Sequence, residues 1–144
     1  MADYTEIEGG LLVPEEFVAA AGASGIKDEG LDTMLLHSRV SASAAATITS
    51  NRFRAAPTYV TERHVANGSA RTVIANSGNA NAATGTQGMR AAERMAELAA
   101  EGTGVHFEDA LVCSTGRIGV QLPMDKLEAG IPECCSSLSS DTAH

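Results

Sequence analysis

Short apolar runs separated by turn-forming residues dominate the first third of the chain. Residues 16–26 are rich in alanine and are broken by Gly22 and Gly25, so they fit either a strand or a loop. Residues 31–36 and 44–48 contain more branched apolar and threonine side chains, which favour extended structure. The pattern predicts a strand in each of these two segments.

The middle of the chain changes from strand-like to turn-like within a few residues. Residues 57–60 predict a further strand, after which Thr61 offers an N-cap for a short helix that Gly68 would end. Residues 71–75 (RTVIA) are apolar and β-branched, as a buried strand requires. The glycine- and asparagine-rich residues 76–85 follow at once, so this strand must run into a loop.

A helix and a second buried strand are predicted after this loop. Over residues 86–101 apolar side chains recur every three or four positions, with charged side chains largely opposite, and Gly102 would end the helix. Residues 110–113 (ALVC) have the pattern of another strand. If 71–75 and 110–113 are parallel neighbours, the loops after them emerge at one sheet edge. The predicted class is α/β with helices layered on a sheet.

The end of the chain is small and polar. Residues 134–144 (CCSSLSSDTAH) are interpreted as a Ser-rich tail or linker, so that residues 1–133 form one α/β domain. No helix or strand is predicted after the loop-like residues 122–124. We therefore expect the sheet to keep unpaired edges, which favour self-association.

Composition and charge restrict the class of partner. Of 144 residues, 44% are hydrophobic and 19% charged, which is typical of a globular protein, and only 3% are aromatic, so the core must be built from small aliphatic side chains. A net charge of −8 without a basic cluster argues against nucleic acid. The acidic N-terminus has no signal-peptide features and no apolar run is long enough for a membrane span, so a cytoplasmic protein is predicted.

The asparagine-rich loop is the first candidate for chemistry. Asn76, Asn79 and Asn81 lie between a strand and a helix N-terminus, where free backbone amides favour an anion. No glycine signature of a nucleotide-binding loop is present. The same side chains can equally hydrogen-bond to a long turn, and both interpretations stay open here.

The second candidate is the turn at the end of the 110–113 strand. A threonine hydroxyl and backbone N–H groups at Thr115 and Gly116 could converge on a developing oxyanion. A nucleophile is harder to find, since Cys113 is expected to be a buried strand residue and no GxSxG elbow is present. The remaining histidines are expected to be solvated or to cap a turn: His37, His64 and His106. Cys134 and Cys135 are expected to be structural.

Four segments, taken together, resemble a known family. They are GLLVPEEFVAAAGASGIK at 10–27, TSNRFRAAPTYV at 49–60, NSGNANAATGTQG at 76–88 and CSTGRIGVQLPM at 113–124. Their order and spacing, from about residue 10 to residue 131, resemble those of the ornithine acetyltransferase family. The combination of NSGNAN with STGxIG is more specific than either motif alone.

The resemblance implies an N-terminal-nucleophile enzyme that cleaves its own precursor before a threonine. That threonine, at the start of a β chain, attacks N-acetylornithine, and the acetyl-Thr intermediate passes the acetyl group to glutamate in arginine biosynthesis, with no metal or other cofactor. This chain corresponds to the N-terminal part of the α chain in an α2β2 assembly. The family's oxyanion-hole pair falls on Thr115 and Gly116, followed by Arg117 where members often have an aliphatic residue.

The same comparison predicts an incomplete site. The α chain of the family continues to an autocleavage junction that this sequence, ending at His144, does not include. Thr142 is internal, has no free amine and is interpreted as a linker residue. We therefore expect a chain that is inactive without a β chain. The alternative is a stand-alone module that binds a small anion or metabolite without catalysis.

Overall fold

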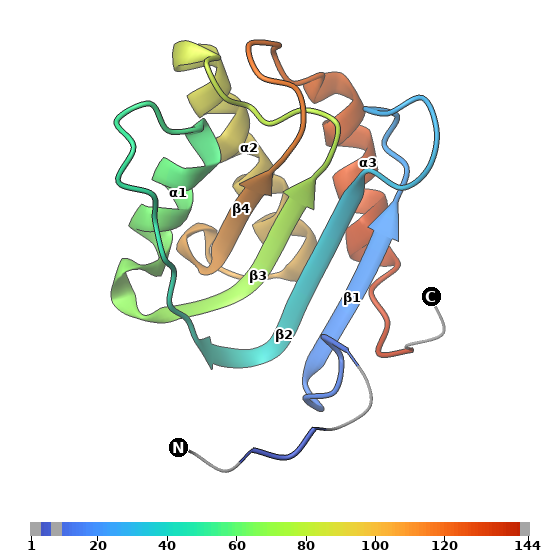
Figure 1. Ribbon diagram of the computed structural model, residues 1–144. Helices are drawn as coiled ribbons and strands as arrows, with labels where there is room; N and C mark the ends of the chain where they lie inside the picture. Colours follow the sequence, from blue (N-terminus) through green and yellow to red (C-terminus); the bar gives the residue numbers. More distant parts are fainter. Residues whose placement is uncertain (1–3, 7–9, 142–144) are drawn as a thin grey trace.

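One four-stranded sheet, covered by helices on a single side, makes up the fold. The computed structural model describes residues 4–6 and 10–141. Along the chain the elements are β1 (Phe17–Gly22), β2 (Thr33–Ser43), α1 (Ala56–His64), β3 (Ser69–Asn76), α2 (Gly85–Thr103), β4 (Ala110–Ser114) and α3 (Met124–Ser136), with single 3-10 turns at Val65–Asn67 and Phe107–Asp109. The strands lie in the order β1, β2, β3, β4, and all three helices lie behind them in Figure 1.

The sheet combines an antiparallel half with a parallel half. β1 pairs with β2 and β2 with β3 in antiparallel fashion, whereas β3 pairs with β4 in parallel, with Val73 opposite Leu111 and Asn76 opposite Ser114. A parallel pair needs a crossover, and α2 supplies it. The predicted α/β class and the parallel neighbours are confirmed, so the loops after β3 and β4 emerge at one edge.

The core lies between the sheet and the helices and is built mainly from small side chains. Leu35, Ile74 and Val112 point from the sheet toward a run of buried alanines on α2. α2 and α3 approach so closely that a Cβ added at Gly102 would lie 2.4 Å from Cys135 Sγ. This close approach is what a chain with few aromatics can build.

Two predicted strands are wrong. Residues 57–60 belong to α1, because Pro57 sits in the first helical turn, where its missing N–H costs nothing. Thr61 is therefore a mid-helix residue and not an N-cap. Residues 44–48 follow the end of β2 without entering the sheet.

The final helix, α3, was not predicted. It contains Gly130 and Pro132, which weaken the helical signal, yet Gly130 fits because a Cβ there would lie 1.9 Å from Ser24 Oγ. The helix runs through residue 133, where the domain was expected to end, and buries Cys134 and Cys135 in its last turn. Thr142 lies outside the described residues.

Both edges of the sheet are partly closed. At β4 the Thr61 hydroxyl donates to Val112 O (2.7 Å) and accepts from Val112 N–H (2.9 Å). At β1 the backbone groups of Ala19 and Ser139 exchange two hydrogen bonds of 2.9 and 3.1 Å. The expectation of unpaired edges is thus wrong at these two positions.

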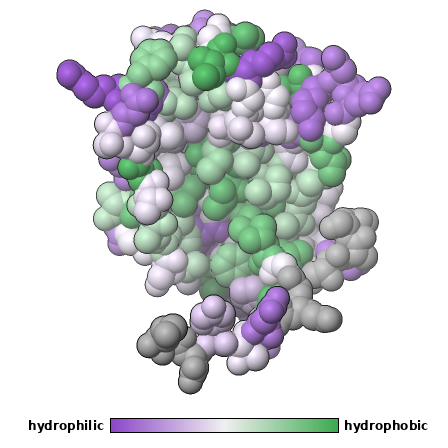
Figure 2. Space-filling model, viewed as in Figure 1, coloured by the Kyte–Doolittle hydropathy of each residue, from purple (hydrophilic) through white to green (hydrophobic). Residues whose placement is uncertain are grey.

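The sheet face opposite the helices is open and apolar. Directly paired residues share a face, so two rows of side chains cross the four strands there. The rows are Ala19, Leu36, Val73 and Leu111, and Ala21, Met34, Ala75 and Cys113; all eight are half-buried or exposed, and we call them the open face. Figure 2 shows this side as a mainly hydrophobic surface. Among the described residues, no helix is long and apolar enough to span a membrane.

Replacing Thr61 with valine should test the closure at β4. The variant keeps the shape of the side chain but leaves Val112 N–H and O without their partner, at an expected cost of about 1–3 kcal/mol in the free energy of unfolding. Urea denaturation measures it. Thr47→Val, at an exposed threonine in the 44–55 loop, is the control and should stay within about 0.5 kcal/mol of the unchanged chain. Equal stability of both variants would contradict a role for Thr61.

Candidate active site

Three loops meet at the edge of the sheet where β3 and β4 end. They are residues 23–32 between β1 and β2, residues 77–84 after β3, and residues 115–123 after β4. The second and third are joined by backbone hydrogen bonds, including Ala80 N–H to Arg117 O (2.9 Å) and Gly119 N–H to Ala82 O (2.8 Å). The predicted convergence of the two loops is therefore confirmed.

Gly116 allows this contact because it has no side chain. Its φ of 132° is one that residues with a Cβ rarely adopt. A Cβ added there would lie 2.3 Å from the carbonyl carbon of Gly78 and 2.5 Å from Asn79 N. The two backbones thus pack directly on each other, and the position of Thr115 follows from that packing.

The hydrogen bonds around Thr115 leave two donors without acceptors. Thr115 N–H donates to Asn76 O (3.0 Å) and Arg117 N–H donates to Gly78 O (3.3 Å). Within residues 4–6 and 10–141, neither the Thr115 hydroxyl nor Gly116 N–H has a recorded acceptor, and both residues are exposed. Adjacent free donors of this kind can bind an anion or stabilise a developing negative charge.

The asparagines of the loop serve its own structure. Asn79 and Asn81 are 1% and 0% exposed. The Asn79 amide donates to Val120 O (3.0 Å) and its oxygen accepts from Asn81 N–H (2.8 Å), while the Asn81 amide donates to Gly88 O (2.8 Å). Asn76 donates to Asn79 O (2.9 Å). Of the two interpretations left open, the structure favours the long hydrogen-bonded turn over the anion loop.

Asp32 attaches the third loop and was missed by sequence reasoning. Its carboxylate accepts from the backbone N–H groups of Ser24 (2.7 Å), Ile26 (2.6 Å) and Lys27 (3.0 Å), and its own carbonyl accepts from Ser77 N–H (2.8 Å). Burial raises the pKa of Asp32, but the three backbone donors outweigh burial and the pKa lies below its ordinary value. The only signal in the sequence is an aspartate directly before an apolar strand.

The histidines and cysteines among residues 10–141 do not supply a nucleophile or base at this edge. His37 and His64 are buried, contrary to expectation: His37 Nδ1 bonds to Thr72 and His64 Nδ1 to Ala110 O, both at the opposite end of β4 from Thr115. His106 is exposed before the same end. Burial, followed by the charges of Arg71 and Arg39, lowers the pKa of His37.

Cys113 is exposed on the open face, so the expectation of a buried thiol is wrong. Cys134 and Cys135 are buried, and burial raises the pKa of Cys135 to about 11, as an inert structural thiol would have. Within the part of the chain that the structure describes, no three His, Cys, Asp or Glu side chains are grouped closely enough to hold a metal ion.

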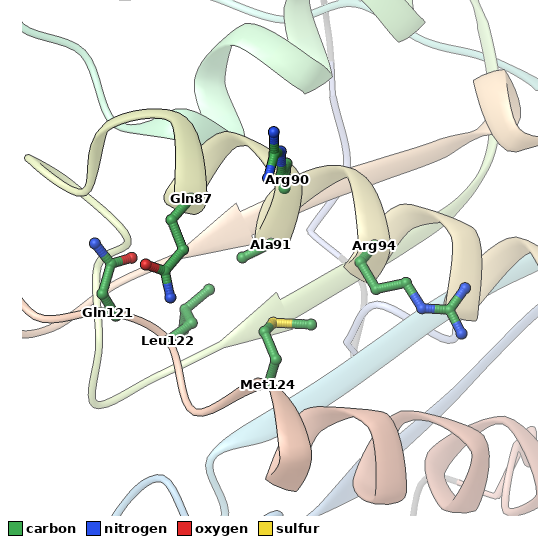
Figure 3. Close-up of a pocket in the computed structure, with 7 residues that line it drawn as sticks. All are labelled: Gln87, Arg90, Ala91, Arg94, Gln121, Leu122 and Met124. Atoms are coloured by element: carbon green, nitrogen blue, oxygen red, sulfur yellow. The ribbon is translucent and has the colours of Figure 1, made fainter.

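A small cavity lies between α2 and the end of the 115–123 loop, where the chain enters α3. Its volume is about 210 Å³. Arg94 lines the cavity, forms an ion pair with Glu97 (2.9 Å) and lies 3.6 Å from both Glu101 and Glu128. In Figure 3, Gln87, Gln121 and Leu122 lie close together at one end of the lining, and Arg94 extends along α2 away from them. Arg90 also lines the cavity and has no recorded ion pair, but the lining holds no side chain that could act as a nucleophile or base, so we do not place the active site there.

Comparison with known proteins assigns the family. A family model described as "ArgJ family" matches residues 18–144. The chain belongs to the ArgJ family. The arginine biosynthesis bifunctional protein ArgJ of Symbiobacterium thermophilum is 47% identical over 138 residues, which are 94% of this chain and 34% of that protein. The ArgJ protein of Caldanaerobacter subterraneus is 42% identical over 142 residues, 96% of this chain and 35% of that protein.

Solved structures of the same family share this fold. The crystal structure of ornithine acetyltransferase from Mycobacterium tuberculosis, solved as a complex with ornithine, superimposes with a TM-score of 0.87 at 38% identity, over 92% of this chain and 72% of that one. The fold class inferred from the resemblance is confirmed. The chain spans about a third of the length of the curated ArgJ relatives it matches, in their N-terminal portion.

Gly116→Ala should disrupt the edge where the loops meet. The added Cβ collides with backbone atoms and not with a flexible side chain, so the loops must separate. Gly119→Ala is a matched control, because Gly119 also has a positive φ (80°) but no atom lies within 4 Å of an added Cβ. We expect Gly116→Ala to cost at least about 2 kcal/mol more than Gly119→Ala in thermal or urea unfolding. Similar costs would show that the backbone contact is unimportant.

Asp32→Asn should make stability depend less on pH. Because the folded-state pKa is lowered, the stabilisation by the carboxylate is fully present above the unfolded-state value near 3.8 and is lost as the pH falls through the folded-state pKa. We expect a deficit of about 2–3 kcal/mol at pH 7 that stays constant down to about pH 4 and shrinks as the pH falls further. Urea unfolding from pH 7 to about pH 2 measures it. Asp28→Asn, at an exposed position, is the control. A deficit that does not change with pH would refute this assignment.

Proposed function

We propose that this chain is the N-terminal α-chain portion of a glutamate N-acetyltransferase, which moves an acetyl group from N-acetylornithine to glutamate in arginine biosynthesis. The observation that carries the proposal is the pair of free donors, the Thr115 hydroxyl and Gly116 N–H, at the carboxyl end of β4. Family membership and the ornithine bound to the Mycobacterium tuberculosis relative support the substrate class.

In the proposed reaction the two donors act as an oxyanion hole. The threonine hydroxyl of a β chain attacks the acetyl carbonyl of N-acetylornithine, and the carbonyl oxygen gains negative charge as the tetrahedral intermediate forms. The Thr115 hydroxyl and Gly116 N–H stabilise that charge until the C–N bond breaks and ornithine leaves with a protonated amine. They do so again when the amine of glutamate attacks the acetyl-Thr ester, whose C–O bond then breaks to return the threonine hydroxyl and release N-acetylglutamate. The packing of Gly116 on Gly78 holds the backbone of this turn, and with it the Gly116 N–H, in place before the charge appears. The reaction needs no cofactor.

The open face is the proposed contact surface for the remainder of the enzyme. Four apolar strands that no layer of the described chain covers are an unusual surface for a free protein. A groove of about 860 Å³ adjoins the face at β1, with Leu11, Leu31 and Met34 among its lining residues. Two thirds of the length of the curated relatives lies outside this chain. We place a β chain on this face, as the partner that supplies the nucleophilic threonine within an α2β2 assembly.

The test is co-expression with the part of the Symbiobacterium thermophilum relative that this chain does not match. We expect the two to co-purify and to transfer acetyl from N-acetylornithine to glutamate, whereas the chain alone transfers none. A pure, folded complex that transfers no acetyl group from N-acetylornithine to glutamate would refute the proposal. Activity of the chain alone would show instead that it contains its own nucleophile.

Thr115→Val in that complex should lower kcat by about 10²–10³ with a smaller change in KM, because the lost hydrogen bond is made mainly in the transition state. Thr115→Ser keeps the hydroxyl and should retain much of the activity. Steady-state kinetics with both substrates measures the effect. Equal activity of the valine variant would remove Thr115 from the oxyanion hole.

A further inference from the structure

Two basic side chains border the peptide on which Gly116 packs. A Cβ added at Gly78 would lie 2.9 Å from Lys27 Cγ, so the aliphatic part of Lys27 packs on Gly78, while its ammonium lies 4.0 Å from where a Cβ on Gly30 would be. From the other side, Arg117 donates its backbone N–H (3.3 Å) and its Nε (3.5 Å) to Gly78 O. Lys27 and Arg117 are far apart in sequence, and the three converging loops bring them to the same peptide.

Neither charge is neutralised within the described part of the chain. Recorded ion pairs there join carboxylates to Arg54, Arg63 and Arg94, and none involves Lys27 or Arg117. Asp28 and Glu29 follow Lys27 in sequence but are not paired with it. Both basic residues are exposed. Lys27 and Arg117 are therefore two exposed, unpaired basic residues on loops that meet at Gly78.

The position of both residues is held by the backbone. Lys27 N–H is bound by the buried Asp32 carboxylate (3.0 Å), and the same aspartate accepts from Ser77 N–H through its carbonyl. Because Nε of Arg117 is directed at Gly78 O, the two terminal nitrogens of its guanidinium stay available as a fork, the geometry that suits a carboxylate. Lys27 adds a point charge.

We propose that Lys27 and Arg117 form a carboxylate-binding rim that holds the amino-acid substrate against the Thr115 and Gly116 donors. The proposal rests on the proposed function, whose substrates both carry an α-carboxylate. A carboxylate held beside a developing oxyanion is repelled by it, and two cations next to the carboxylate offset that repulsion. Lys27 and Arg117 are thus positioning residues that act on substrate binding and leave the bond-making step to other groups.

The first test needs no partner chain. Glutarate, a dicarboxylate without an amino group, is titrated into the purified chain by calorimetry, and the variants Lys27→Gln and Arg117→Gln are compared with Arg90→Gln. Arg90 is an exposed arginine of α2 without a recorded ion pair, so it is a matched control. We expect glutarate binding to weaken about fivefold in each rim variant and to stay unchanged in the control. Absence of binding to the unchanged chain, or equal binding by all variants, would overturn the rim.

The second test uses the co-expressed complex. Lys27→Gln and Arg117→Gln should each raise KM for glutamate and for N-acetylornithine about fivefold and leave kcat nearly unchanged. The conservative variant Lys27→Arg should keep the KM of the unchanged enzyme. A general structural defect would not change KM while leaving kcat unchanged. Added salt should raise KM less in the variants than in the unchanged enzyme. If the two rim variants weaken glutarate binding and the control does not, but the complex transfers no acetyl group, the proposed function fails and the rim stands. If the complex is active and neither substitution changes KM, the rim fails and the function stands.

Discussion

The contact between the backbones of Gly78 and Gly116 is the constraint on which the site depends. At a distance where a single methyl group would collide, the loop after β3 and the loop after β4 act as one unit. Thr115 then points out of a fixed turn, and the neighbouring amides are divided between those that hold the loops together and the one that remains free. Asp32 ties the hairpin loop of β1 and β2 to the same unit, so all four strands contribute to one edge.

The layering of the molecule follows from the size of its side chains. Alanine and glycine on α2 let the helices lie close to one side of the sheet and leave little space inside. The other side carries larger aliphatic residues such as Leu36 and Val73, which nothing in the described chain covers. A sheet that is apolar on both faces is usual where a layer packs on each side. The chain thus resembles two layers of an architecture with at least three.

The sequence was informative where local pattern and burial agree. The β-branched run of β3, the short β4 and the amphipathic α2 were predicted from periodicity, and their parallel pairing followed from the strand, helix, strand order. α1 was misjudged because its Tyr59 and Val60 favour strands, while Pro57 could begin a helix equally well. α3 was missed because its glycine is explained only by Ser24, more than a hundred residues earlier.

For the site, the turn at Thr115 was visible in the sequence, but its role came from resemblance to a family. The Thr115 amide is already bonded to Asn76 O, a contact across the parallel strand pair that no local pattern reveals. The meeting of Lys27 with Arg117 likewise depends on three loops at once. The buried His37 and His64 bond to Thr72 and to the backbone of Ala110, which are 35 and 46 residues away in sequence. Their burial could therefore not be predicted from local sequence.

The Thr61 hydroxyl, which occupies both backbone groups of Val112, has a consequence for the way copies of this chain can meet. Association along a sheet edge can repeat without limit, because each added strand presents a new edge to the next molecule. Association through a face is satisfied by one partner and then stops. Because α1 closes part of the β4 edge and the open face remains uncovered, the fold favours assemblies of finite size over open-ended polymers.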